Sequence, residues 1–288
     1  MADTSNPEAL CIFEDDRYLN FFPLALNKPV FGLMIGTHPL WDRIYGEVGF
    51  ERLSLICRPY LADVLKETLE TKYPDREIVI NAVHEGNVLF INGRLLAYRD
   101  ELTALLEEVR LNTVIDKNGV PVIALLDEPK AASFFEYLER SLQDSEVLKV
   151  FEKLSVLKNE EGDKDLPGVE EQIETKEAEL AEWASSNKVI REKTGLKLLS
   201  FYWQLIAENG KCLIDDFQKY PMRGSAPESE LFKGVDLINE DDIVLGAGVE
   251  VRSGTVLDAT EGPVIIADGV KIEPVSYTHL TLPTTPYV

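Results

Sequence analysis

Residues 11–31, "CIFEDDRYLNFFPLALNKPVF", form the stretch that decides the fold. A short apolar run leads into an acidic loop with a single arginine, and the chain then returns through Lys28-Pro29-Val30. An apolar strand that opens into a polar loop is typical of an α/β domain that binds a nucleotide at its sheet edge. The glycines that let a backbone wrap around phosphate are absent from this loop.

Apolar runs and helical patterns alternate on both sides of the acidic loop. The runs predict strands at 9–14, 52–57, 77–82, 87–93 and 120–126, and the periodicity predicts helices at 60–73 and 98–111. Strands separated by helices of this length indicate βαβ units and a mostly parallel sheet covered by helices. The predicted fold of the first part of the chain is therefore α/β and Rossmann-like.

The middle of the chain is strongly acidic. Helical periodicity continues from residue 131 to about 157, and ten acids against two lysines follow between 159 and 182. The apolar residues Val169, Ile173, Leu180 and Ala184 share one helical face. The segment near 159–190 is therefore expected to be a helix with a charged, solvated outer face.

A period of six appears towards the C-terminal end of the sequence. Aliphatic residues recur at Leu245, Val251 and Leu257, and then at Ile266 and Ile272 after a slip of three residues around "TEGP". This hexapeptide pattern is typical of a left-handed parallel β-helix with three sides. Residues 237–274 have room for about two coils, so we expect a truncated β-helix. Residues 275–288 break the period and are expected to be a non-native tail.

Length and composition set limits on function. With 288 residues, the chain is expected to form one large domain over 1–226 and a smaller one after it. The net charge of −22 argues against a nucleic-acid surface, but it allows a small anion held by local donors. No apolar stretch is long enough to span a membrane. Three scattered cysteines indicate core residues of a cytoplasmic protein.

Four stretches carry a resemblance to a known family. They are "IFEDDRYLNFFPLALNKPVF", "NVLFINGRLL", "LIAENGKCLIDDF" and "GVEVRSGTVLDATEGPVIIADGVKIEP". In them the chain resembles a divergent bacterial branch of the bifunctional N-acetylglucosamine-1-phosphate uridyltransferase/glucosamine-1-phosphate acetyltransferase family. The resemblance implies a nucleoside triphosphate and a sugar phosphate as ligands. It also implies a homotrimeric full-length form that binds acetyl-CoA only in coils beyond this chain.

The resemblance assigns phosphate and substrate contacts to a few side chains. Arg17 falls where the family's Gly-rich loop carries an arginine, and its planar guanidinium can clamp a phosphate. Lys28 matches the lysine of the family's Gly-Lys-Pro turn, whereas the family's catalytic lysine has no counterpart between these two residues. Asn92, Gly93 and Arg94 follow a strand end, where open α/β sheets bind ligands, and are expected to contact substrate.

Mg²⁺ is the cofactor that the resemblance implies. The family holds it with an aspartate after a strand, and the uncharged Asn92 stands at that position. The acids Glu14, Asp15 and Asp16 would repel a triphosphate unless a divalent cation bridges them, so Asp15 and Asp16 are the expected metal ligands. Phosphoryl transfer depends on positioning and charge neutralisation, and this chain lacks the glycines, the lysine and the aspartate that supply both.

Each candidate also has a purely structural interpretation. Arg17 can pair with a neighbouring aspartate, and Lys28-Pro29 can simply shape a turn. Asn92-Gly93 is a common hairpin or loop dipeptide, and Arg94 can be solvated.

Three functions remain open on the sequence. The first is a sugar-1-phosphate nucleotidyltransferase of nucleotide-sugar metabolism with a truncated acyltransferase β-helix. The second is a catalytically degenerate module that binds a nucleotide or sugar phosphate and serves an acyltransferase. The third is a structural protein. Thermal stabilisation by a nucleotide would favour the first, because a ligand that binds the native state raises its stability.

Overall fold

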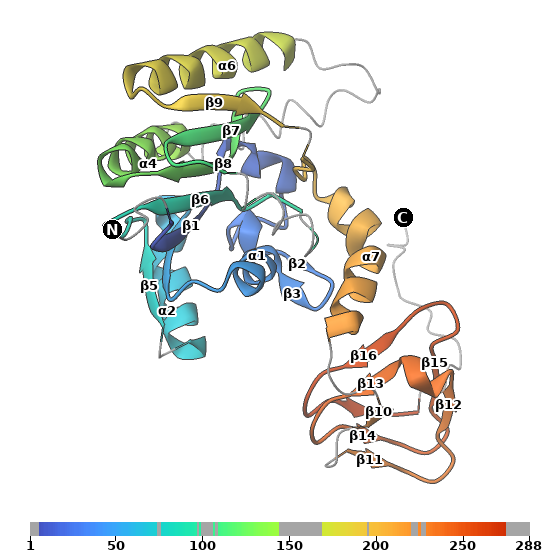
Figure 1. Ribbon diagram of the computed structural model, residues 1–288. Helices are drawn as coiled ribbons and strands as arrows, with labels where there is room; N and C mark the ends of the chain where they lie inside the picture. The colour runs from blue at the N-terminus through green and yellow to red at the C-terminus, as the bar shows by residue number, and fades with distance from the viewer. Residues whose placement is uncertain are drawn as a thin grey trace, which may run out of the picture. The chain divides into compact units, whose positions relative to one another are not determined.

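The computed structural model describes residues 6–73, 76–96, 98, 106, 109–143, 169–194, 196–219, 224–225 and 229–274. The chain forms two compact units, Met1–Glu208 and Asn209–Val288 (Figure 1). The first unit is built around one large sheet, and the second contains the end of a helix followed by short stacked strands. None of the helices in these ranges has both the length and the apolar character needed to cross a bilayer.

A seven-stranded sheet with the order β5-β4-β1-β6-β8-β7-β9 forms the centre of the first unit. Its strands are β1 (Ala9–Phe13), β4 (Arg52–Ile56), β5 (Glu77–Ile80), β6 (Val88–Asn92), β7 (Thr113–Lys117), β8 (Val120–Leu126) and β9 (Ile190–Lys193). The four strands β5, β4, β1 and β6 run parallel, as do β7 and β9. The predicted α/β class with a mostly parallel sheet is confirmed.

Strand β8 departs from the βαβ pattern that the sequence indicates. It runs antiparallel to both neighbours, so that Leu125 pairs with Leu89 of β6 and with Thr113 of β7. Strand β7 was not among the predicted strands, and it joins β8 through Asn118-Gly119 with φ of 54° and 76°. Two consecutive positive φ angles are typical of a tight hairpin. A Cβ at Gly119 would lie only 2.4 Å from the Glu177 backbone nitrogen, so this turn also needs glycine for close approach.

Helices cover both faces of the sheet. They are α1 (Leu40–Val48), α2 (Ala62–Lys72), α4 (Glu128–Gln143) and α6 (Val169–Ser186). Leu10 and Ile12 of β1 belong to a buried cluster that includes Trp41 of α1. On the other face, the Phe134 ring of α4 lies 5.0 Å from the Phe90 ring. All five residues of β1 are buried, as expected for a central strand covered on both sides.

The remaining elements of the first unit are short. They are η1 (Asp16–Phe21), η2 (Val30–Gly32), β2 (Met34–Ile35), β3 (His38–Pro39) and η3 (Pro59–Leu61). Helix α7 (Trp203–Lys219) contains the boundary between the two units. The 3₁₀ helix η1 follows β1 directly, and η3 follows β4 in the same way. Both therefore begin near the carboxyl edge of the parallel strands.

The second unit is a stack of short parallel strands. These are β10 (Gly224–Ser225), β11 (Glu230–Leu231), β12 (Asp236–Ile238), β13 (Ile243–Leu245), β14 (Glu250–Val251), β15 (Val256–Asp258), β16 (Val264–Ile266) and β17 (Lys271–Ile272), with η4 at Glu240–Asp242. They form the ladders β10-β13-β16, β11-β14-β17 and β12-β15. Glu230 pairs with Glu250, which pairs in turn with Lys271, so the chain returns to the same side after 20 or 21 residues.

The hexapeptide positions form the core of this unit. Leu245, Val251 and Leu257 are buried in one cluster, and Ile266 and Ile272 pack against it. The return of 20 or 21 residues is longer than the eighteen expected from three hexads. One cause is the "TEGP" segment, which adds residues between β15 and β16 and explains the slip in the period. The paired strands also begin before residue 237, the predicted start of the β-helix, because β10 pairs with β13 and β11 pairs with β14.

Some sequence predictions lie wholly or partly outside the described residues. The proposed tail at 275–288 is one, and most of the helix predicted over 98–111 is another. The acidic segment near 159–190 is described from residue 169 onward, where α6 forms and buries Leu180 and Ala184 as its predicted apolar face requires.

Candidate functional site

The candidate site lies where β1 and β6 end side by side. Phe13 is paired with Asn92 at the last position of the two strands, and Glu14 and Gly93 follow them. Because carboxyl ends of parallel strands meet at one edge, the acidic loop and the 92–94 segment come together there. Both segments therefore lie at the carboxyl edge of the parallel strands, where the sequence placed them.

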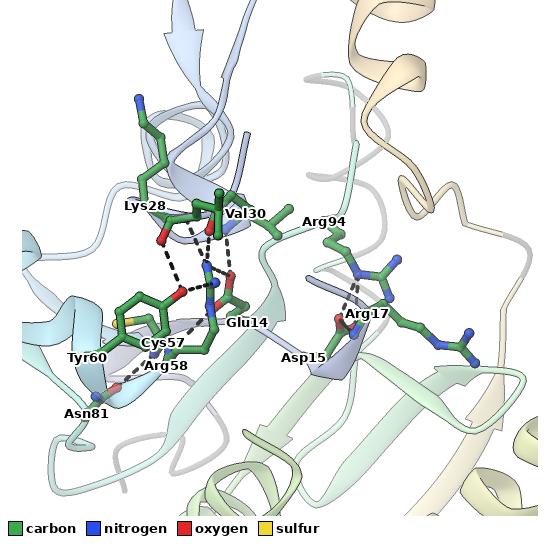
Figure 2. A network of polar contacts seen from close by, with 12 residues as sticks. Glu14, Asp15, Arg17, Lys28, Val30, Cys57, Arg58, Tyr60, Asn81 and Arg94 are labelled. Atoms are coloured by element: carbon green, nitrogen blue, oxygen red, sulfur yellow. Dashed lines mark hydrogen bonds and ion pairs between the residues drawn. The ribbon is translucent and has the colours of Figure 1, made fainter. Parts of the chain in front are cut away.

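Glu14 forms a buried ion pair with Arg58, the second residue after β4 (Figure 2). The guanidinium donates from Nε to Oε2 at 2.9 Å and from Nη2 to Oε1 at 3.2 Å. The Val30 backbone N–H donates to Oε1 at 2.8 Å. Burial raises the pKa of Glu14, whereas the Arg58 charge and these hydrogen bonds act in the opposite direction.

Arg58 also fixes the loop that precedes Lys28. Its Nη2 donates to the carbonyl oxygens of Ala25 at 2.6 Å and Lys28 at 3.0 Å. Its Nη1 donates to the Tyr60 hydroxyl, and the guanidinium lies 4.3 Å from the centre of the Tyr18 ring. A side chain that is only 1% exposed therefore satisfies its donors inside the protein and shapes the return of the chain towards Val30.

Asp15 pairs with Arg94 rather than with the neighbouring Arg17. The Arg94 Nε donates to Oδ1 at 2.9 Å, and Nη2 donates to Oδ2 at 2.5 Å. The Asn92 amide donates to Oδ2 at 2.7 Å, and the Arg17 backbone N–H donates to Oδ1 at 3.1 Å, which caps η1. Burial alone would raise the pKa of Asp15, but the Arg94 charge and these hydrogen bonds hold it below its usual value.

Arg94 and Asn92 are themselves held in place. The Arg94 Nη1 donates to the Leu199 carbonyl oxygen, and the Leu199 N–H donates to the Arg94 carbonyl oxygen at 2.9 Å. The Asn92 Oδ1 accepts from the Arg94 backbone N–H at 3.0 Å, and its amide also donates to the Pro121 carbonyl oxygen. The solvated interpretation of Arg94 is wrong, because this side chain is buried.

Asp16 has a third cation as its partner. The Lys176 ammonium of α6 lies 3.3 Å from the Asp16 carboxylate and 3.4 Å from the Glu179 carboxylate. Burial lowers the pKa of Lys176, but the two carboxylates outweigh this and raise it. Lys176 also lines a cavity of about 520 Å³ between α4 and α6, together with Tyr137 and Trp183.

Arg17 and Lys28 differ from the other charged residues of this edge. Within the described part of the chain, neither side chain makes an ion pair or a side-chain hydrogen bond. Arg17 is half-buried and Lys28 is exposed. Figure 2 shows their side chains pointing away from each other, with the Glu14–Arg58 pair between them. The structure therefore does not bring these two predicted phosphate contacts together.

Gly93 is required for packing and not for a hairpin. A Cβ at this position would lie 2.5 Å from the Phe31 Cβ and 3.2 Å from the Phe13 carbonyl oxygen. Its N–H donates to that same Phe13 oxygen at 2.8 Å, which continues the β1–β6 ladder. Asn92-Gly93 does not join two paired strands as a hairpin would, but it begins a turn in which the Leu95 N–H donates to the Asn92 carbonyl oxygen at 2.9 Å, in agreement with the loop interpretation.

The residues expected to hold Mg²⁺ do not offer a suitable donor set. Asp15 accepts from Arg94, Asn92 and Arg17, and Asp16 is paired with Lys176. Among the residues that the structure describes, no group of three His, Cys, Asp or Glu side chains is arranged to hold a metal ion. Mg²⁺ prefers free carboxylates and water in an octahedral arrangement, so we derive no step through it.

Sequence reasoning missed Arg58, Lys176 and Tyr60. Arg58 carries a signal that could have been used, because it directly follows the "RLSLIC" strand and so belongs to the same sheet edge as Glu14. Lys176 carries no such signal. It stands in an acidic helix whose charged residues were assigned to a solvated face.

Comparison with known families decides the relationship. The profile of a family described as sugar nucleotidyl transferase matches residues 10–222, well over half of the sequence. The chain belongs to the sugar nucleotidyl transferase family. The match begins in β1 and contains the acidic loop, Arg58 and the 92–94 segment. The polar network is therefore inside the part of the chain that defines the family.

Solved and curated proteins add less. A crystal structure of a Bacillus anthracis protein, described as a glucose-1-phosphate thymidylyltransferase in complex with sucrose, superimposes with a TM-score of 0.41 and 9% identity. The alignment covers 72% of this chain and 96% of that one. No curated protein matches the sequence. These values carry no argument about the site.

Proposed function

We propose that the Met1–Glu208 unit is sugar-1-phosphate nucleotidyltransferase-like and binds the phosphate groups of a nucleoside triphosphate and a sugar phosphate. One observation supports this most strongly. The three acids of the loop each have an internal cation, namely Arg58, Arg94 and Lys176. The loop therefore does not repel phosphate as its sequence suggests, and Arg17 and Lys28 remain as available positive charges in a protein with a net charge of −22.

The reaction class follows from the family. An oxygen of the sugar phosphate attacks the α-phosphorus of the triphosphate, one P–O bond forms, and the bond to the leaving pyrophosphate breaks. Arg17, at the start of η1 and beside the β1–β6 edge, would hold phosphate oxygens as charge moves onto the leaving group. Lys28 would contact a separate phosphate group, because the two side chains point away from each other.

A second candidate function is binding without turnover. Asn92 is uncharged and is saturated by hydrogen bonds to Asp15, Arg94 and Pro121, so it has no spare group for chemistry. The catalytic lysine of the resembling family is also absent from residues 18–27. The module would then hold a nucleotide or sugar phosphate for chemistry carried out elsewhere.

We also propose that the stacked strands from Gly224 onward belong to a left-handed parallel β-helix of an acyltransferase. Their support is the buried hexapeptide series and the regular return to the same side. In this proposal the full-length protein is a homotrimer of the divergent bacterial branch, and it binds acetyl-CoA in coils beyond this chain. A cytoplasmic location agrees with the three buried cysteines, which form no disulfide.

The test combines ligand binding with turnover. Thermal melting of the full chain with each common nucleoside triphosphate, with α-D-glucose 1-phosphate and with both should show stabilisation, since ligands that bind only the native state raise its stability. Pyrophosphate release then separates the two candidate functions. Binding with release supports transfer, binding without release supports the second function, and no stabilisation at millimolar ligand contradicts both.

Substitution of the two available cations gives the first prediction. Arg17→Ala should weaken the binding of the stabilising ligand by about tenfold or more, because a charge-assisted hydrogen bond contributes about 1.5–3 kcal/mol. Lys28→Ala should weaken it separately, and the two losses should add in free energy because the side chains do not meet. Isothermal titration calorimetry measures both.

Arg52→Ala is the matched control for these variants. Arg52 is the first residue of β4 and therefore stands at the opposite edge of the sheet, where its Nη1 donates to the Glu85 carbonyl oxygen. The Arg52→Ala variant removes the same charge as Arg17→Ala and Lys28→Ala. An equal loss of affinity in all three variants would show that the loss reflects net charge and not direct contact with the ligand.

A further inference from the structure

We propose that the Arg94 guanidinium takes the place of a divalent cation at the β1–β6 edge, so that this site binds its phosphorylated ligand without a metal ion. The inference rests on the proposed function. It goes further by naming the ligand class, which is a phosphate ester or diphosphate that is not chelated to Mg²⁺. Sugar phosphates and nucleotide sugars belong to this class.

The coordination capacity of Asp15 is already used. Its two oxygens accept from the Arg94 Nε and Nη2, from the Asn92 amide and from the Arg17 backbone N–H, at distances between 2.5 and 3.1 Å. An ionised carboxylate offers about four lone-pair positions. A metal ion could bind Asp15 only by displacing donors that the fold holds in place.

Arg94 cannot move aside to admit a cation. Its side chain is 3% exposed, its Nη1 donates to the Leu199 carbonyl oxygen, and its backbone forms hydrogen bonds with Leu199 and Asn92. A divalent cation beside a fixed, buried guanidinium would experience strong repulsion, because screening is weak in the protein interior. The positive charge that a metal would supply is thus already present as part of the chain.

The other expected ligands are equally engaged. The Asn92 Oδ1 accepts from the Arg94 backbone N–H, and the Asp16 carboxylate faces the Lys176 ammonium. The Arg17 side chain is different, since it extends from the same edge and makes no ion pair or hydrogen bond with the described residues. The Arg17 guanidinium is therefore the group at this edge that can contact the ligand, because the carboxylates there are paired with Arg58, Arg94 and Lys176. This arrangement suits a phosphate that arrives without bound Mg²⁺.

Two titrations of the full wild-type chain test the inference. The first adds Mn²⁺ and follows the electron paramagnetic resonance signal of the free ion, with Asp15→Asn as the matched variant. We expect wild type and variant to take up equal amounts of Mn²⁺, since any uptake by this acidic protein lies away from Asp15. Uptake by the wild type that disappears in Asp15→Asn would overturn the proposal.

The second titration measures the affinity for α-D-glucose 1-phosphate and for UDP-glucose by calorimetry, in EDTA and in MgCl₂. We expect the two dissociation constants to agree within about twofold, and a tenfold weaker affinity in EDTA would overturn the proposal. If neither probe binds in either buffer, the proposed function fails. The Mn²⁺ titration then decides by itself whether Arg94 excludes a cation.

Removing the guanidinium provides a gain of function. Arg94→Gln leaves Asp15 without its cation, so we expect Mn²⁺ to bind at least tenfold more tightly than in the wild type. The double variant Arg94→Gln/Asp15→Asn should lose this gain, and a gain that persists would contradict the assignment. Circular dichroism shows whether Arg94→Gln is folded; if it is not, the wild-type and Asp15→Asn titrations decide.

Discussion

Arg58 carries a full charge in the interior, and its hydrogen-bond partners come from three separate parts of the chain. It contacts the Glu14 carboxylate, two backbone carbonyl oxygens of the 22–29 loop and the Tyr60 hydroxyl. A buried ion pair contributes little compared with a well-packed apolar pair, but the loss of one partner leaves the other charge buried and uncompensated. The Glu14–Arg58 pair therefore stabilises the acidic loop only while both residues are present.

Arg58→Met should lower the free energy of unfolding of the first unit by about 3–5 kcal/mol, because Glu14 keeps a buried carboxylate without a cation. Arg58→Lys retains the charge but loses the planar fork, so its loss should be smaller. Urea unfolding followed by tryptophan fluorescence measures both changes. Arg52→Met is the control, since Arg52 is the arginine at the start of β4 and is partly exposed. A loss in Arg58→Met no larger than in the control would contradict the expected role.

The candidate residues were partly predictable at this scale. Their position at the carboxyl edge follows from the ends of two apolar runs, and Asn92 and Asp15 do meet there. The ion pairs were not predictable, because local sequence suggests that Arg17 neutralises a neighbouring aspartate. The actual partners of Asp15 and Asp16 are Arg94 and Lys176, which become neighbours only through the sheet and through α6.

At the scale of elements, the sheet shows which features sequence can predict. The runs at 9–14 and 87–93 form β1 and β6 because continuous apolar residues suit a strand that is buried on both faces. The direction of β8 was not predictable, since apolar composition is the same for parallel and antiparallel neighbours. Strand β7 was not predicted because its "TVIDK" sequence ends in two charged residues, which are unusual in a buried strand. One of them, Asp116, is buried and forms an ion pair with Arg191.

The junction after β6 tolerates no side chain at position 93. Gly93→Ala should lower the free energy of unfolding by about 1–3 kcal/mol, because its Cβ would overlap the Phe31 Cβ and force the packed core to shift. Gly46→Ala is the control with the opposite sign. Gly46 lies inside α1 with open space around its Cα, so the substitution should stabilise by about 0.5–1 kcal/mol. Urea midpoints measure both, and equal effects of the two variants would refute the packing argument.

At the scale of the whole molecule, the two units differ greatly in the size of their cores. The cluster in the second unit contains six buried residues, whereas the first unit buries residues from five strands of its large sheet and from several helices. The hexapeptide period predicted three of these six residues, Leu245, Val251 and Leu257, together with Ile266 and Ile272, which pack against them. It did not predict the 20- or 21-residue return, because a period of six carries no information about insertions at the corners.

Val251→Ala should therefore affect the second unit alone. Loss of the two methyl groups should lower the free energy of unfolding of the second unit by about 2 kcal/mol. This figure combines about 0.8 kcal/mol per buried carbon with a further contribution from the cavity. The three tryptophans, Trp41, Trp183 and Trp203, all lie in the first unit. The urea midpoint by fluorescence should stay constant, while part of the far-UV circular dichroism signal is lost earlier. Val256→Ala, at an exposed position of β15, is the control. A shift of the fluorescence midpoint would show that the units unfold together.

The order in which the loop acids acquire their cations has a consequence during synthesis. Glu14 is followed by Arg58 after 44 residues, Asp15 by Arg94 after 79, and Asp16 by Lys176 only after a further long stretch of chain. Ribosomes add about 5–20 residues per second, so the last acid remains without its partner for on the order of ten to thirty seconds. The sheet edge can therefore assume its final electrostatic character only after α6 has been made, although the loop itself is among the first segments to emerge.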